Sequence, residues 1–123
     1  MKIFIVEDEA ALADALDDKF KHEGYQTKVV YEGGSAFKAA KEFKPDIVLL
    51  DLLLPKKGGY EVLKEIKDDE ELKSVPVIIL SNLDTDEDIK KSMALGAADY
   101  FVKSNHPLKE VIEKVKTQLL KAK

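Results

Sequence analysis

The sequence predicts an α/β protein in which a parallel sheet of five strands is covered by helices on both faces. Three observations predict this class. Short, continuously apolar segments recur along the chain, each is followed by a segment with helical spacing, and glycine or proline often separates the two. Short continuous apolar runs are typical of strands buried on both faces, as in parallel sheets. Right-handed crossovers between such strands place helices on both sides of the sheet.

Five segments are expected to form the strands. In chain order they are Ile3–Val6, Gln26–Val30, Ile47–Leu50, Val77–Leu80 and Asp99–Val102. Pro45 precedes the third strand and Pro76 begins the fourth, where a missing N–H does least harm to the hydrogen-bond ladder. We expect a doubly wound sheet with the strand order 2-1-3-4-5.

Apolar stripes with helical spacing predict one helix after each strand. The stripes are Leu12, Leu16 and Phe20; Phe37, Ala40 and Phe43; Val62, Leu63 and Ile66; Ile89 and Met93; and Leu108, Val111, Ile112, Val115 and Leu119. Gly24 and Gly96 are expected to end the first and fourth helices, and Pro107 to open the fifth. Ser35 and Asp84 are the expected N-caps of the second and fourth helices. We interpret the stripe residues as core.

The composition limits the function classes that remain open. The chain has 123 residues, 20 basic and 24 acidic side chains, a net charge of -4 and no cysteine. This length suits a single domain over residues 1–123. The lack of cysteine excludes thiol nucleophiles and cysteine-held zinc, and the interspersed charges argue against a nucleic-acid partner. Because every basic residue is lysine, arginine-finger chemistry is excluded as well.

No targeting or membrane-spanning segment is expected. Only Ile3–Val6 separates Lys2 from Glu7, which is too short for the core of a signal peptide. The longest apolar run, Ile47–Pro55, is interrupted by Asp51, so it does not predict a membrane span. We therefore expect a cytoplasmic protein without a membrane partner.

Polar side chains follow four of the five predicted strands. Glu7 and Asp8 come after the first strand, Asp51 after the third, Ser81 after the fourth and Lys103 after the fifth. Each has an ordinary explanation when taken alone, as a turn former or an exposed charge. In parallel sheets, however, ligands bind beyond the carboxyl ends of the strands, where the strand order reverses. We therefore expect these five side chains to converge.

The chemistry of this group favours phosphoryl transfer with a divalent metal. Asp51 is flanked by leucines, and a lone buried carboxylate costs several kcal/mol unless it is paired. Three converging carboxylates repel one another, and Lys103 supplies only one positive charge. Oxygen ligands favour Mg²⁺, with Mn²⁺ as a substitute. Asp51 is the natural nucleophile, Lys103 would neutralise phosphoryl oxygens, and Ser81 would donate a hydrogen bond.

In these features the chain resembles the receiver domains of two-component response regulators, especially the single-domain type found in chemotaxis. The resemblance covers essentially the whole chain and implies a flavodoxin-like (βα)5 fold. Its motifs are the acidic pair in Val6-Glu7-Asp8, Asp51 within Leu49–Pro55, Gly58-Gly59, Ser81, and the segment Gly96–Lys103. No single motif is specific, but their order and their placement at strand ends together are.

The resemblance implies a role for each matching residue. Asp51 would accept phosphate from a histidine kinase or a histidine phosphotransfer protein. Asp8, Asp51 and the backbone carbonyl of Leu53 would bind Mg²⁺, with Glu7 acting mainly through a water, and Lys103 would contact the phosphoryl group.

The resemblance also implies a switch. Ser81 would move towards the phosphoryl group and Tyr100 would turn inward behind it, which would remodel the face made by the fourth helix, fifth strand and fifth helix for a downstream effector. Such a receiver assists its own phosphorylation and dephosphorylation and is not an enzyme with turnover. We expect a monomer, with phosphorylation-dependent dimer formation left open.

Four positions depart from the family pattern. Ser104 follows Lys103 where proline in a cis peptide is usual, and a cis bond without proline costs about 3 kcal/mol. Asn82 replaces a small residue after Ser81. Leu53 and Leu83 are apolar at positions that in the family influence how water reaches the phosphoryl group. From this we hypothesise a comparatively long-lived acyl phosphate.

Other uses of this fold lack their motifs. In a flavodoxin-type electron carrier, Glu7-Asp8-Glu9 would repel the flavin phosphate after the first strand. Neither GxGxxG nor GxxxxGK[ST] is present for a nucleotide. The DxD of a haloacid dehalogenase-like phosphatase is missing after the first strand and at Asp51. One alternative stays open, namely a receiver-like interaction module that is not phosphorylated.

Overall fold

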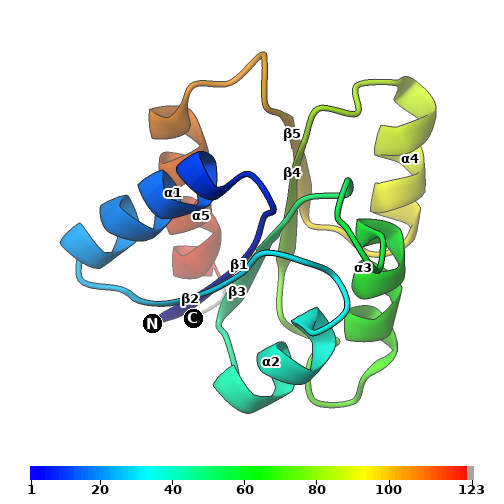
Figure 1. The fold of residues 1–123 in the computed structure, drawn as a ribbon, viewed down its shortest axis with the longest axis horizontal. Helices are drawn as coiled ribbons and strands as arrows, with labels where there is room; N and C mark the ends of the chain where they lie inside the picture. The colour runs from blue at the N-terminus through cyan, green and yellow to red at the C-terminus, as the bar shows by residue number, and fades with distance from the viewer. Residues whose placement is uncertain (122–123) are drawn as a thin grey trace.

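The computed structural model describes residues 1–121 as alternating strands and helices (Figure 1). The strands are β1 (Lys2–Val6), β2 (Gln26–Val30), β3 (Ile47–Leu50), β4 (Val77–Ser81) and β5 (Asp99–Val102). The helices are α1 (Ala10–His22), α2 (Ala36–Phe43), α3 (Gly59–Asp68), α4 (Asp86–Ala94) and α5 (Leu108–Lys121).

The strands form one parallel sheet in the order β2-β1-β3-β4-β5, which confirms the predicted flavodoxin-like topology. In the register of the sheet, Val6 lies opposite Leu50, and Leu50 lies opposite Ile79. The strand order reverses between β1 and β3, because the chain passes from the edge strand β2 across β1 to β3. The residues that follow Val6 and Leu50 therefore lie close together at the point where the strand order reverses.

The core has two layers because alternate side chains of each strand point to opposite faces of the sheet. Ile3 and Ile5 pack with α1 and α5 on one face, whereas Phe4 and Val6 pack with α2 and α3 on the other. Figure 1 shows α4 on the same side of the sheet as α3. The three central strands are buried throughout except for Lys2, which explains their continuously apolar sequences.

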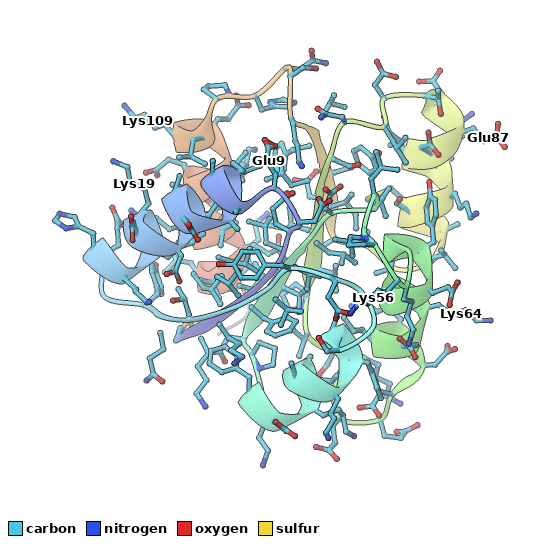
Figure 2. All side chains as sticks on the ribbon, in the orientation of Figure 1. Glu9, Lys19, Lys56, Lys64, Glu87 and Lys109 are labelled. Atoms are coloured by element: carbon cyan, nitrogen blue, oxygen red, sulfur yellow. The ribbon has the colours of Figure 1, made fainter. Side chains whose placement is uncertain are left out.

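Charged side chains occupy the outer surfaces of the helices. Lys19, Lys64, Glu87 and Lys109 project outward from four different helices (Figure 2). None of the helices within residues 1–121 combines the length and the apolar character that crossing a bilayer requires.

The helix ends confirm the predicted positions of Gly24, Gly96 and Ser35 and correct that of Asp84. Gly24 and Gly96 follow α1 and α4 with φ values of 94° and 107°, the left-handed conformation that glycine adopts readily. The N-cap of α4 is Thr85 and not Asp84, because the Thr85 hydroxyl accepts the N–H of Asp88 at 3.1 Å. Ser35 stands at the N-cap of α2, but its hydroxyl donates to the Glu32 carboxylate and does not cap the helix.

The loops before α2 and α3 pack backbone against backbone. The N–H of Gly33 donates to the carbonyl of Pro55 at 3.1 Å. A Cβ added at Gly33 would lie 1.8 Å from the carbonyl oxygen of Lys57, so only glycine allows this approach. The side chains of Glu32 and Lys56 add an ion pair at 3.5 Å across the same two loops.

Candidate functional site

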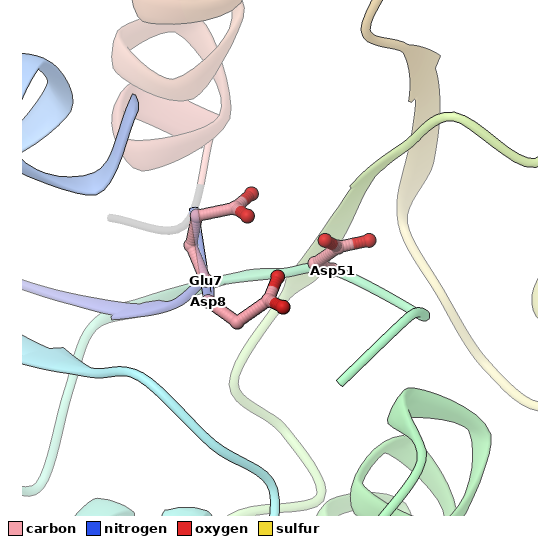
Figure 3. A group of neighbouring side chains, drawn as sticks. All are labelled: Glu7, Asp8 and Asp51. Atoms are coloured by element: carbon pink, nitrogen blue, oxygen red, sulfur yellow. The ribbon is translucent and has the colours of Figure 1, made fainter. Parts of the chain in front are cut away.

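Three carboxyl groups meet where the strand order reverses. Glu7 and Asp8 follow directly after β1, and Asp51 follows directly after β3. One oxygen from each of the three carboxyl groups lies within 4.8 Å of those of the other two (Figure 3). The pairing of β1 with β3 produces this meeting, because it sets Val6 beside Leu50.

Two of these carboxylates are buried and one is exposed. Glu7 is 2% exposed and Asp51 is 3% exposed, whereas Asp8 faces solvent. Backbone donors compensate part of the burial, since the N–H of Glu9 donates to Glu7 at 3.0 Å and that of Leu53 donates to Asp51 at 3.1 Å. The carboxylate of Asp8 thus remains the most accessible of the three.

Lys103 joins the two buried carboxylates. Its Nζ lies 2.9 Å from Glu7 Oε1 and 3.0 Å from Asp51 Oδ2, with Glu9 Oε1 further away at 3.9 Å. The N–H of Lys103 donates to the carbonyl of Ser81 at 2.9 Å, which fixes the backbone at the end of β5. No peptide bond within residues 1–121 is cis, so Lys103 reaches Asp51 from a trans peptide with Ser104.

The ionisation of the site reflects burial and pairing together. Burial raises the pKa of Glu7 to about 7, although the hydrogen bonds from Lys103 and from the N–H of Glu9 act in the opposite direction. Burial also disfavours the charged form of Lys103, but hydrogen bonds to Glu7 and Asp51 outweigh it and raise the pKa of Lys103. The ammonium therefore stays charged, while the carboxyl of Glu7 titrates near neutral pH.

Ser81 and Tyr100 lie together beside this group. Ser81 is the last residue of β4 and is fully buried, and its hydroxyl accepts the N–H of Leu83 at 3.3 Å. The hydroxyl of Tyr100 donates to the carbonyl of Leu83 at 2.5 Å, so Tyr100 points inward over the loop after β4. The switch role of these two residues remains a prediction.

Three of the positions that depart from the family pattern differ in their exposure. Leu53 is 52% exposed, and Leu83 packs partly buried against the α2 and α3 side of the core. Asn82 is exposed and lines a cavity of about 360 Å³ next to Lys103, bordered by α1, β4 and α5. The side chain of Asn82 is therefore placed to contact whatever approaches Lys103 from that side.

The residues present fit a hard divalent cation. The cluster offers only carboxylate oxygens, and two of its three carboxylates are buried where like charges repel one another. Mg²⁺ and Mn²⁺ prefer such oxygen donors, whereas zinc prefers thiolate and imidazole ligands.

Two contacts at the site were not anticipated from the sequence. Glu9 adds a third acidic side chain near Lys103, and the continuous run Glu7-Asp8-Glu9 was the available signal. Gly59 lies against the backbone of Asp51 and donates its N–H to the carbonyl of Leu52 at 2.9 Å. No pattern in one sequence distinguishes this contact from an ordinary turn glycine.

Comparisons with known proteins agree with this fold. A family model described as the response regulator receiver domain matches residues 3–116. The Francisella response regulator 1452 receiver domain is 27% identical with a TM-score of 0.90, and the match covers 99% of this chain and 98% of that one. The BeF3-activated N-terminal receiver domain of Klebsiella pneumoniae RstA is also 27% identical, with a TM-score of 0.87 and coverages of 97% and 98%. The Mn²⁺-bound form of response regulator Rcp1 is 31% identical, with a TM-score of 0.80 and coverages of 94% and 89%.

Proposed function

The chain belongs to the family of response regulator receiver domains of two-component systems, and from this premise we propose that Asp51 is its phosphoacceptor. The donor would be a histidine kinase or a histidine phosphotransfer protein, and the reaction would depend on Mg²⁺. One observation carries the proposal. The Lys103 ammonium contacts Asp51 at 3.0 Å and Glu7 at 2.9 Å, in the same group as Asp8.

The proposed transfer uses the buried carboxylate as a nucleophile. A carboxylate oxygen of Asp51 attacks the phosphorus of a phosphoimidazole, so that a P–O bond forms and the P–N bond breaks. The electron pair of the broken bond stays on the imidazole nitrogen. Lys103 is already in contact with Asp51 and would pair with the phosphoryl oxygens as they arrive. The Ser81 hydroxyl, at the end of the adjacent β4, would donate a hydrogen bond to the same group.

Asp8, Asp51 and the backbone carbonyl of Leu53 would hold the Mg²⁺, with Glu7 contributing through a water. When bound, Mg²⁺ or a substituting Mn²⁺ supplies positive charge for the phosphoryl oxygens. Two observations support this assignment. Asp8 is exposed, whereas both oxygens of Glu7 are engaged by Lys103. The similar protein Rcp1 has been solved in a Mn²⁺-bound form.

Phosphorylation would then act as a switch. Ser81 and Tyr100 would rearrange and shift the population of the face formed by α4, β5 and α5, and an effector protein would read that face. Tyr100 supports this route, because its hydroxyl is bonded to the loop that joins Ser81 to α4. In this proposal the protein is a cytoplasmic signalling receiver that assists its own phosphorylation and dephosphorylation.

Intact mass measurement after incubation with acetyl phosphate and Mg²⁺ tests the proposal. We expect the wild type to gain the mass of one phosphoryl group, and we expect no gain for Asp51→Asn or in the presence of excess EDTA. Absence of a gain in the wild type would favour the interaction module that is not phosphorylated. The exposed Asn82 and the residue Ser104 are the features that keep this alternative open.

A further inference from the structure

The helix α4 is held only weakly by apolar burial. Of its nine residues only Ser92 is fully buried. Ser92 is polar, and among the described residues its hydroxyl is buried without a hydrogen-bond partner. Contacts made to α4 by side chains of other elements therefore carry more weight than they would on a well-buried helix.

Tyr60 of α3 makes such a contact. Its hydroxyl donates to Asp88 Oδ1 at 2.7 Å, and the ammonium of Lys91 lies 4.1 Å from the centre of its ring. The other carboxylate oxygen of Asp88 accepts the hydroxyl of Thr85 at 2.7 Å, so Asp88 is fixed at the start of α4. Tyr60 is thus held by two residues that stand one turn apart on the same face of α4.

Tyr60 is also tied closely to the phosphoacceptor. It follows Gly59, the first residue of α3, whose N–H donates to the carbonyl of Leu52 at 2.9 Å. A Cβ added at Gly59 would lie 2.3 Å from the carbonyl oxygen of Asp51, which shows how closely the two backbones approach. A movement of the Asp51–Leu52 peptide therefore displaces the start of α3, and Tyr60 with it.

We propose that Tyr60 is a positioning residue that transmits a change at Asp51 to α4 by a route separate from Ser81 and Tyr100. The inference rests on the proposed phosphorylation of Asp51. It assigns to the sequence segment Gly59-Tyr60 a coupling role that the phosphotransfer chemistry itself does not require.

Ser92 is a second polar neighbour of Tyr60 on α4. Ser92 lies one turn beyond Asp88 and close to the Tyr60 hydroxyl. Burial and the hydrogen bond to Asp88 raise the pKa of Tyr60 to about 12, whereas Ser92 acts to lower it.

The test measures the response to beryllofluoride with Mg²⁺, which mimics an acyl phosphate, by backbone NMR on the full chain. The variant is Tyr60→Phe, and the matched control is Tyr31→Phe, which removes an exposed phenol that donates to Asp14 on α1. For Tyr60→Phe we expect an apparent dissociation constant changed by at least about fivefold. On addition of beryllofluoride we also expect the chemical-shift changes at the amides of α4 to be less than half of those in the wild type. The chemical-shift change at the amide of Ser81 should be retained. Asp88→Asn keeps an acceptor for Tyr60 and should stay within about twofold of wild type.

Affinity is the decisive readout, because it is measured at Asp51. A phenol that only stabilises α4 locally would leave the affinity unchanged when it is removed. If Tyr60→Phe matches Tyr31→Phe in both readouts while the wild type responds, the coupling role is refuted and the phosphoacceptor assignment stands. A wild type that responds neither to beryllofluoride nor to acetyl phosphate would refute both.

Discussion

Replacing Gly59 by alanine tests the contact on which the geometry of the phosphoacceptor loop depends. The new Cβ would lie 2.3 Å from the carbonyl oxygen of Asp51 and 2.4 Å from the Cα of Leu52. Both obstacles are backbone atoms, so α3 and the loop must separate by about 1 Å, and overpacking of this kind costs roughly 1–3 kcal/mol. We expect the upper end, about 3 kcal/mol, because no flexible side chain can yield.

The direction of the stability change distinguishes steric overlap at Gly59 from helix propensity. Propensity alone makes alanine about 1 kcal/mol better than glycine within a helix. We instead expect a melting temperature about 10 °C below wild type and a matching loss in urea denaturation. Gly58→Ala is the control, since nothing lies within 4 Å of its added Cβ. Gly58 is the N-cap residue of α3, and alanine there should cost less than about 1 kcal/mol as a poorer N-cap.

Phosphorylation of the same two variants by acetyl phosphate gives an independent check. Gly59→Ala should react more slowly, because the displaced loop carries Asp51, while Gly58→Ala should react at nearly the wild-type rate. A Gly59→Ala protein at least as stable as Gly58→Ala would refute the close backbone approach and the reasoning built on it.

Three further outcomes are expected. Burial raises the pKa of Glu7 from 4.5 to about 7. Between these two pH values the folded protein keeps a proton that the unfolded chain has already released. In metal-free buffer the free energy of unfolding, measured by urea titration, should therefore fall by about 2 kcal/mol between roughly pH 5 and 8, and the Glu7→Gln variant should lack this fall. The same pH dependence in the wild type and in Glu7→Gln would contradict the expectation. Leu53→Asn should admit water and speed hydrolysis of the acyl phosphate in a phosphate-release assay, whereas an unchanged rate would count against the long-lived intermediate. Thr85→Ala should cost about 1 kcal/mol in thermal denaturation and Asp84→Ala much less, and the reverse order would show that the cap is misassigned.

Burial made the sheet predictable from the sequence. The expected ranges Gln26–Val30, Ile47–Leu50 and Asp99–Val102 coincide with β2, β3 and β5. Central strands of a parallel sheet must be apolar on both faces, so their sequences differ from those of helices without any tertiary information. The strand order then places the ends of β1 and β3 side by side. For this reason Glu7 and Asp51 could be predicted to lie close together.

Features that depend on side-chain rotamers and on the relative placement of helices could not be predicted from the sequence. Asp84 and Thr85 are both good N-caps, and only the bond from Asp88 decides between them. The contact from Tyr60 to Asp88 depends on how α3 and α4 lie against each other, which neither segment specifies alone. The sequence likewise predicted Lys103 near the carboxylates, but it did not predict that its ammonium would bridge two of them.

The interlocked backbones at Gly33 and Lys57 limit how these two loops can be redesigned. Both segments lie on the rim beside the carboxylate cluster, and neither can change its path without displacing the other. Diversifying one while keeping its companion constant should yield mostly misfolded variants. A useful library would vary residues 32–34 and 55–58 jointly, so that each new conformation of one loop is paired with a compatible conformation of the other.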